Sequence, residues 1–192
     1  MARVIHPIEV ESYRILRSRI DLSHLPPLTR AVTERVIHAA ADLSFADSLI
    51  LDEATLIKGR EALLNGAPVY CDSRMTASGI TSRRPIVPLD DARATRREGV
   101  TRSAAAMRLA TSEASEGAVW VIGNAPTALA ELIAHPPPKP ALIVGLPVGF
   151  VGAAEAKALL ADSSLPSITN RGERGGSAVA VAAVNALIYF DA

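Results

Sequence analysis

The chain has 192 residues, is 49% hydrophobic and has a formal net charge of zero. This length suits a single domain with a sizeable buried core, which we expect to span residues 1–192. The apolar content excludes a disordered protein. The charge balance gives no indication of a nucleic acid or a membrane surface as a partner.

The sequence contains few features that bear on targeting or redox chemistry. Cys71 is the only cysteine, which excludes a disulfide within the chain. The first residues lack the apolar core and cleavage site of a secretory signal. The apolar run over 141–154 is too short to span a bilayer. We therefore expect a cytoplasmic protein.

The basic residues are unusual in kind, because 17 are arginine and only three are lysine. Eight of these arginines lie between Arg74 and Arg108, where only three residues are acidic. Arginine is suited to bidentate binding of carboxylate or phosphate groups. Two interpretations of the high number of arginines stay open: an anionic ligand, or a genome that favours arginine codons. The clustering of the arginines favours the ligand.

The first half of the chain predicts helices with short strands between them. Pro26 and Pro27 interrupt the chain after the first helix, and Pro27 suits the first turn of the second. On that second helix Leu28, Val32 and Val36 share an apolar face. The predicted elements are a helix over 7–22, a helix that opens at 27, a helix over 52–65, a strand over 68–71, a loop with a short helix over 72–84, a strand over 86–89, a polar surface loop over 90–99 and a helix over 104–111.

His38 does not share the apolar face of the second helix. At 100° per residue it falls beside Glu34, Arg35 and Asp42, all of which are charged. Two interpretations remain: a histidine that faces solvent, or one that is aimed at a cleft or a partner.

A polar cluster precedes the helix over 104–111. Ser103 can cap this helix, which places Arg102 beside its positive end. An anion there would meet a guanidinium and free backbone N–H groups. The commoner alternative is a surface arginine next to an ordinary helix cap.

From residue 117 onward, short apolar strands alternate with helices. The pairs are 119–122 with 126–134, 141–144 with 153–161, and 167–169 with 177–190. Three successive strand–helix units predict a parallel sheet with right-handed crossovers. We therefore predict an α/β fold of three layers, in which a mostly parallel, Rossmann-like sheet is flanked by helices.

The turn after the strand over 119–122 is a candidate binding element. Asn124 and Thr127 offer polar side chains beside the free N–H groups of the helix that Pro126 opens. Such turns lie at the carboxyl ends of strands, where open α/β sheets bind ligands. An asparagine here can instead bond its own backbone as a turn residue, and both interpretations stay open.

Absent motifs exclude several classes of protein. The chain has no G-x-x-x-x-G-K-[ST] phosphate loop, no G-x-G-x-x-G nucleotide fingerprint, no H-E-x-x-H or cysteine pair for a metal, and no G-x-S-x-G elbow of a hydrolase. Three glycine-rich turns, a few polar side chains and the displaced His38 remain. This set is typical of a site that binds a large anionic ligand and performs mild proton chemistry.

Five segments together resemble the precorrin-8X methylmutase family. They are VIHA over 36–39, TRSAAA over 101–106, IGNAPTA over 122–128, PVGFVGAAE over 147–155 and RGERGGS over 171–177. They occur in the order of the family, and the resemblance covers most of the chain, from about residue 7 to 187.

The resemblance implies an isomerase of cobalamin biosynthesis. In this family a methyl group moves from ring carbon 11 to ring carbon 12 of precorrin-8X by a suprafacial 1,5-sigmatropic shift, which gives hydrogenobyrinate. With cobalt in the substrate, cobalt-precorrin-8, the product is cobyrinate. The resemblance further implies no added cofactor, no metal held by the protein, and a homodimer with the tetrapyrrole at the subunit interface.

The family's catalytic histidine matches His38, whose implied role is to donate a proton or hydrogen bond to a ring nitrogen of the substrate. Histidine suits this step because an ordinary imidazole, with a pKa of about 6.5, has both forms accessible near neutrality. The substrate-side positions that the resemblance implies are Ser12, Thr81, Arg102, Ser103, Asn124, Thr127, Gly145 and Val148. Arg102 is expected to pair with one of the substrate's many carboxylates. The alternative function is a non-catalytic binder or carrier of late corrinoid intermediates, which would not need His38 as a proton donor.

Overall fold

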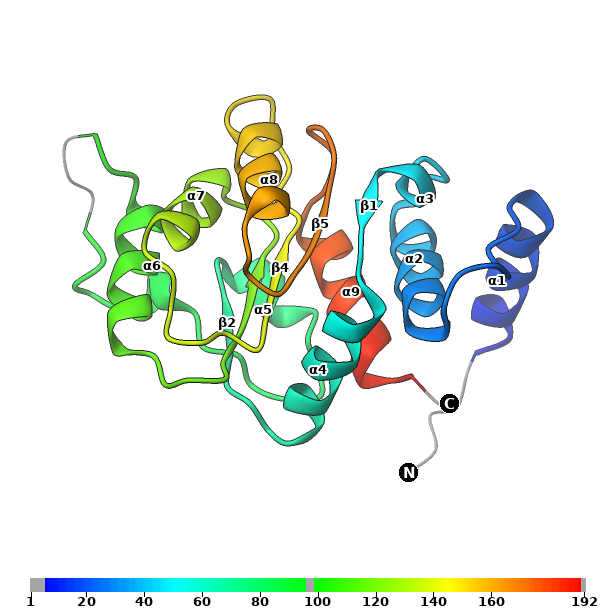
Figure 1. The fold of residues 1–192 in the computed structure, drawn as a ribbon, viewed down its shortest axis with the longest axis horizontal. Coiled ribbons are helices and arrows are strands. Elements are labelled where there is room, and N and C mark those ends of the chain that lie inside the picture. The colour runs from blue at the N-terminus through cyan, green and yellow to red at the C-terminus, as the bar shows by residue number, and fades with distance from the viewer. Residues whose placement is uncertain (1–5, 96–98, 191–192) are drawn as a thin grey trace.

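The fold was analysed in a computed structural model, which describes residues 6–95 and 99–190 (Figure 1). Its centre is a five-stranded sheet in the order β1-β5-β4-β3-β2. The strands are β1 (Leu49–Ile50), β2 (Val69–Cys71), β3 (Val119–Ile122), β4 (Leu142–Gly145) and β5 (Ser167–Asn170). Strands β2 to β5 are parallel, and β1 joins β5 as an antiparallel edge. The predicted fold of a mostly parallel sheet is confirmed.

Helices cover both faces of this sheet (Figure 1). Helices α6, α7 and α8 lie on one face, and α2, α4 and α9 lie on the other. The bounds are α1 Pro7–Arg19, α2 Pro27–Ala40, α3 Phe45–Ser48, α4 Glu53–Leu64, α5 Arg74–Ser78, α6 Arg102–Glu113, α7 Pro126–Ala134, α8 Ala153–Asp162 and α9 Ser177–Ile188, with a 3-10 helix over Pro88–Asp90.

The side chains of the central strands point alternately to the two faces of the sheet, which explains the three layers. All four residues of β3 are buried, because a parallel sheet is covered on both faces. Trp120 and Ile122 enter the core beneath α6, α7 and α8, whereas Val119 and Val121 enter the core beneath α2, α4 and α9. Successive side chains of a strand point to opposite faces, so one short strand supports two separate cores.

Helix α9 is central because it is built almost entirely from small apolar residues. Nine of its 12 residues are buried, and α5 approaches it closely at Gly79. A Cβ atom on Gly79 would lie 2.7 Å from Cγ1 of Val181, so only glycine permits this contact. The close approach brings α5 and α9 together at one side of the candidate site described below.

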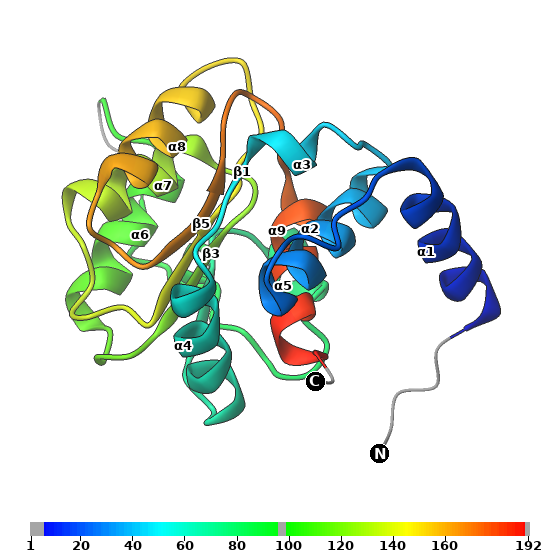
Figure 2. The same ribbon diagram turned by 45° about the vertical axis from the view of Figure 1, so that its right-hand side comes forward.

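Helix α1 stands apart from the rest of the molecule (Figure 2). It packs along α2, and its outward apolar side chains Ile8 and Val10 are 73% and 56% exposed. None of the helices in the described ranges is long and apolar enough to cross a membrane.

Several local predictions need correction. The strand predicted over 86–89 is wrong: Ile86 makes only an isolated bridge with Tyr70, and Pro88 opens a 3-10 helix because proline cannot donate to a ladder. The first helix ends at Arg19 rather than at residue 22, since Ile20 is extended. The loop over 90–99 is described only in part, and Arg96 and Arg97 lie outside the described residues.

Strand β1 and helix α3, of two and four residues, were not predicted. The cap of α6 was also assigned to the wrong residue. Thr101, not Ser103, is the N-cap, and its hydroxyl accepts from the backbone N–H of Ala104 at 3.2 Å.

Candidate active site along helix α9

The crevice at the carboxyl ends of the strands is occupied by the protein's own carboxylate. Asp72, directly after β2, accepts hydrogen bonds from the backbone N–H groups of Gly123, Asn124 and Ala125 at 3.2, 2.7 and 2.7 Å. It also accepts from the hydroxyl of Thr76 at 2.9 Å. The expectation of free N–H groups at the start of α7 is therefore wrong for Asn124 and Ala125.

This carboxylate belongs to a buried polar network that reaches α9. Asp72 is 2% exposed and Thr76 is fully buried. The Thr76 hydroxyl lies 2.9 Å from that of Ser177, the first residue of α9, and 3.0 Å from that of Ser73. The network joins the ends of β2 and β3 to the start of α9.

His38 lies at an open surface instead. Its Nδ1 atom is 2.8 Å from Oγ of Ser12, and its ring stacks on Tyr13 with centroids 5.0 Å apart and planes 13° apart. Both partners come from α1, whereas His38 is an exposed residue of α2. His38 is therefore exposed, has partners on α1 and borders a cavity, so both interpretations, a histidine that faces solvent and one aimed at a cleft or a partner, stay open here.

That cavity has a volume of about 480 Å³ and lies between α2, α5 and α9. Its walls include Arg35 and His38 of α2 and Met75 of α5. The side contributed by α9 is Ser177, Ala178, Val181, Ala182 and Asn185.

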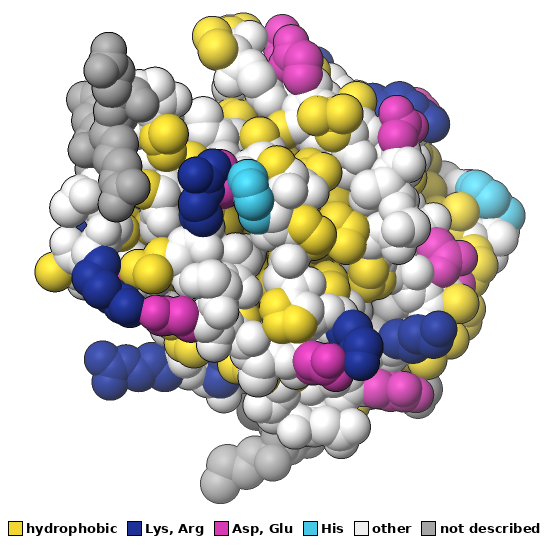
Figure 3. All heavy atoms as spheres, turned by 60° about the vertical axis from the view of Figure 1, so that its left-hand side comes forward, with side chains coloured by type: hydrophobic (Ala, Val, Ile, Leu, Met, Phe, Trp, Pro, Cys, Tyr) yellow, Lys and Arg dark blue, Asp and Glu magenta, His cyan; other side chains and the backbone are white. Residues whose placement is uncertain are grey.

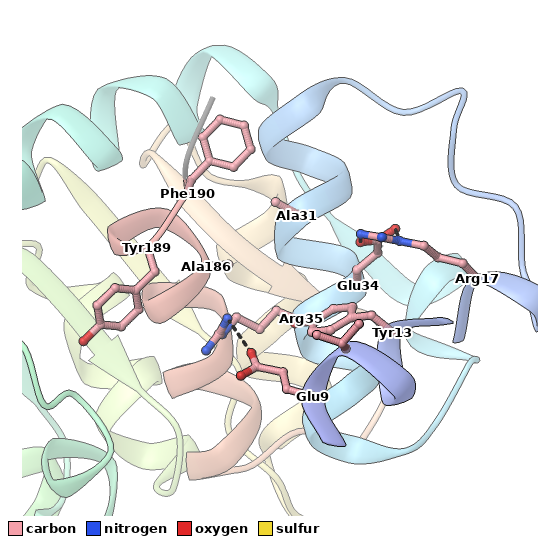
Figure 4. Close-up of a pocket in the computed structure, with 10 residues that line it drawn as sticks. Glu9, Tyr13, Arg17, Ala31, Glu34, Arg35, Ala186, Tyr189 and Phe190 are labelled. Carbon is pink, nitrogen blue, oxygen red and sulfur yellow. Dashed lines mark hydrogen bonds and ion pairs between the residues drawn. The ribbon is translucent and has the colours of Figure 1, made fainter. Parts of the chain in front are cut away.

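A second cavity, of about 460 Å³, continues along the same helix (Figure 4). Its α9 side is formed by Ala186 with Tyr189 and Phe190 just beyond, and its other side by Tyr13 and Arg17 of α1. The α9 residues of the two cavities recur at helical spacing from Ser177 to Tyr189 and share one face. Arg35 borders both cavities, and we call the pair the α9 groove.

Comparisons with known proteins identify the family of the chain. The sequence model of the precorrin-8X methylmutase family matches residues 7–190. The chain belongs to this family.

Two relatives and one solved structure indicate the extent of the likeness. The chain is 44% identical over 191 residues to the precorrin-8X methylmutase of Pseudomonas aeruginosa, covering 92% of this chain and 91% of the relative. It is 38% identical over 197 residues to the cobalt-precorrin-8 methylmutase of Salmonella typhimurium, covering 95% and 93%. The precorrin-8X methylmutase structure from Thermus thermophilus superposes with a TM-score of 0.85 at 33% identity, covering 95% of this chain and 96% of that one.

Within this methylmutase fold, Ser12, His38 and Thr81 lie around the α9 groove. The Thr81 hydroxyl is 3.4 Å from the phenol of Tyr189, which borders the second cavity. Of the expected site residues only His38 lines a cavity of the groove, and Ser12 and Thr81 adjoin it through their contacts with His38 and Tyr189.

A second group of those residues gathers where α6 and α7 begin. The hydroxyl of Thr101 lies 2.8 Å from that of Thr127, which joins the two helix starts. Arg102 donates to the carbonyls of Leu89 and Ala94 at 2.7 and 3.3 Å, so its guanidinium holds the preceding loop. Ser103, half-buried, follows on α6.

The remaining expected residues are spread along the strand ends. Asn124 is exposed. Gly145 is buried in the core, where an added Cβ would lie 2.4 Å from Cδ2 of Leu160 and 3.0 Å from Cδ1 of Leu129. Val148 is 46% exposed in the loop after β4, beside Phe150 and Val151, which are 90% and 88% exposed.

The arginine-rich segment is largely paired within the protein. Arg74 pairs with Asp90 at 2.8 Å, Arg93 with Asp91 and Glu113 at 2.7 Å each, and Arg108 with Glu131 at 2.5 Å, whereas Arg83 donates to the carbonyl of Leu63 at 2.7 Å. On the face drawn in Figure 3, basic and acidic side chains are mixed with apolar ones. That face shows no continuous basic surface.

A buried lysine near the strand ends was missed by the sequence reasoning. Lys157 of α8 is fully buried, and its ammonium donates to Oδ1 of Asn170 at 3.0 Å and to the carbonyl of Arg174 at 2.5 Å. Burial lowers the pKa of Lys157 to about 8, and the nearby Glu173 opposes this shift. The Arg174 guanidinium bonds Asp42 and Ser44, just beyond the C-terminal end of the helix that carries His38.

Proposed function

We propose that this chain catalyses the rearrangement after which its family is named, in the α9 groove and with His38 as the catalytic residue. The bond between ring carbon 11 and the methyl group breaks while the bond to ring carbon 12 forms. No atom leaves the substrate, so the protein needs to supply only orientation and a proton or hydrogen bond. We also propose that residues 1–192 act as one methylmutase domain.

The position of His38 is the observation that carries this proposal. The Ser12 hydroxyl lies 2.8 Å from Nδ1, so Nε2 is the ring nitrogen left for a substrate. If the hydroxyl donates to Nδ1, the neutral imidazole holds its proton on Nε2 and becomes a donor there. Stacking on Tyr13 fixes the plane of the ring. Ser12 and Tyr13 thus support a histidine that can donate to a ring nitrogen.

The groove suits a flat apolar macrocycle. Ala178, Val181 and Ala182 give an apolar floor beside His38, and the α9 face from Ser177 to Tyr189 is about 18 Å long at 1.5 Å per residue. Small side chains on a helix let a planar ligand approach the backbone closely.

We further propose a cytoplasmic homodimer in which the site is completed at the subunit interface, with Thr81, Arg102, Ser103, Asn124, Thr127, Gly145 and Val148 on the substrate side. Two observations support the dimer. The apolar side chains of Ile8, Val10, Phe150 and Val151 are strongly exposed, which is typical of an interaction surface. The residues where α6 and α7 begin also lie outside the His38 cavity, as expected if a second subunit brings its own copy of them to the groove.

An absorption spectrum tests the function. Purified protein is mixed with precorrin-8X and, separately, with cobalt-precorrin-8, and conversion is followed as the appearance of a corrin spectrum. We expect wild type to convert one or both substrates. His38→Ala should lower kcat by about 10²–10⁴-fold and still bind the substrate, because it removes the proton donor.

His24→Ala is the matched control, since His24 is exposed and borders neither cavity of the groove. It should retain wild-type turnover. Binding of both substrates by wild type without conversion of either would contradict the proposal and favour a carrier.

A further inference from the structure

One side of α9 holds the segment over 79–81, which directly follows α5. Val181 and Asn185 of α9 and Tyr189 just beyond it are spaced four apart and lie on this side of the helix. A Cβ atom on Gly79 would lie 2.7 Å from Cγ1 of Val181, and Nδ2 of Asn185 donates to the carbonyl of Gly79 at 3.0 Å. The backbone of Gly79 is thus held by close packing from one turn of α9 and by a hydrogen bond from the next.

Thr81 lies at the other end of the same segment, beside the groove. Its hydroxyl is 3.4 Å from the phenol oxygen of Tyr189. Gly79 and Asn185 line the His38 cavity, and Tyr189 lines the second cavity, where Figure 4 shows it on the α9 side. Because the peptide units between Gly79 and Thr81 are planar and rigid, the position of the Gly79 carbonyl helps to set that of Thr81.

The amide of Asn185 is used on one side only. The carbonyl of Gly79 fixes its orientation, since a flipped amide would place two oxygen acceptors against each other. Its Oδ1 atom is buried and has no hydrogen-bond partner among the described residues. Burial of an acceptor without a partner costs at least as much as a typical hydrogen bond contributes. The amide therefore adds little to stability, which indicates that its bond to Gly79 serves the site.

We propose that Asn185 is a positioning residue, which holds the segment over 79–81 so that the hydroxyl of Thr81 faces the substrate. This inference rests on the proposed function, in which Thr81 lies on the substrate side. Asn185 acts through Gly79 and has no part in the proton step. Loss of its bond should therefore weaken binding and leave the chemistry at His38 intact, because α1 holds His38 independently of α9.

A double-mutant cycle tests the inference with hydrogenobyrinate as the probe, titrated and followed by absorbance. Wild-type turnover of precorrin-8X or cobalt-precorrin-8 is measured first. Thr81→Val removes the hydroxyl and should raise the Kd about two- to tenfold, the effect of losing one neutral hydrogen bond. Asn185→Leu removes the bond to Gly79 at similar volume and should raise the Kd by no more than Thr81→Val does. In the Thr81→Val background it should have no further effect, since no hydroxyl is left to position.

Kinetic constants separate a positioning role from a general loss of structure. Asn185→Leu should raise KM together with Kd and leave kcat within about twofold of wild type. Asn185→Asp keeps the shape but sets a carboxylate oxygen against the carbonyl of Gly79, so it should raise the Kd at least as much. Asn65→Leu is the matched control, because Asn65 is an exposed asparagine at the end of α4 outside both cavities. It should leave Kd, KM and kcat unchanged.

The outcomes distinguish this inference from the function on which it rests. If wild type neither converts either substrate nor binds hydrogenobyrinate, the proposed function fails and the inference fails with it. If wild type converts substrate but Asn185→Leu binds hydrogenobyrinate as wild type does, only the inference is overturned. Additive effects of Asn185→Leu and Thr81→Val, or a loss confined to kcat, would also overturn it, because Asn185 would then act independently of Thr81. If Asn185→Leu does not fold, Asn185→Ala takes its place in the same cycle.

Discussion

The strand-end crevice and the α9 groove both contain charged side chains, but they are built in opposite ways. In the crevice, the carboxylate of Asp72 is buried and accepts four hydrogen bonds from the protein itself. In the groove, His38 is exposed, and the guanidinium of Arg35 lies 3.7 Å from the carboxylate of Glu9. Open α/β sheets ordinarily bind ligands in the crevice. Here the carboxylate of Asp72 bonds the backbone at the start of α7, and the proposed binding site lies on the face of a helix.

The largest loss of stability is expected when the carboxylate of Asp72 is removed. Asp72→Ala leaves three backbone N–H groups without their acceptor, at about 1–3 kcal/mol for each buried group left unsatisfied. We expect the free energy of unfolding in urea to fall by about 4 kcal/mol. Sodium formate should restore part of this loss, because formate supplies a carboxylate to the same donors, whereas sodium chloride should not.

Asp90→Ala is the control for that change. Asp90 pairs with Arg74 at the surface, where such pairs contribute about 0–1 kcal/mol. A loss below 1 kcal/mol for Asp72→Ala, or equal rescue by both salts, would show that the crevice is not filled as described.

The second prediction concerns pH and the buried Lys157. Its pKa is lowered by burial to about 8 in the folded protein, and the unfolded chain has the ordinary lysine value of about 10.4. Between these pH values the unfolded state binds more protons, so the free energy of unfolding of wild type should rise with pH relative to Lys157→Met. The rise is on the order of 1–2 kcal/mol once screening by solvent is allowed for.

Urea unfolding at pH 7 to 10 measures this rise. Lys139→Met is the control, because Lys139 is an exposed lysine whose side chain is 80% accessible, and its difference from wild type should stay flat. A flat difference for Lys157→Met as well would mean that Lys157 keeps an ordinary pKa in the folded state.

The smallest expected effect, in free energy, comes from a bulky side chain placed in the groove. Ala178 is exposed on α9 and lines the His38 cavity, so Ala178→Trp should fill part of the ligand volume. We expect kcat/KM to fall by about tenfold or more, which corresponds to about 1.4 kcal/mol, with stability within about 0.5 kcal/mol of wild type. Ala158→Trp, at an exposed position of α8 outside both cavities, should leave turnover unchanged. Equal kcat/KM for the two variants would show that the substrate does not bind in the groove.

The sequence predicts the parts of this fold that depend on local pattern. Helix α7 has its predicted bounds because Pro126 marks its start, and β3 has its predicted bounds because its run of apolar residues is short and sharply delimited. Strand β1 has two residues and forms by pairing with β5, some 120 positions away, so no local signal predicts it.

The site is harder to predict for the same reason. His38 stands out because it breaks an apolar pattern, and Ser12 entered through the family resemblance. The contacts of Asp72 and Lys157 depend on partners from distant segments. One signal could have been used: Asn185, which lines the His38 cavity, is the only residue with an amide or a charge in the apolar helix α9.

The most direct test of the central claim is a crystal structure of the protein with hydrogenobyrinate bound. We predict that the macrocycle lies along α9 beside His38, with Nε2 of His38 within hydrogen-bond distance of a ring nitrogen. Asp72 should keep its bonds to the start of α7. A ligand bound in the strand-end crevice, with Asp72 displaced and the α9 groove empty, would contradict the account.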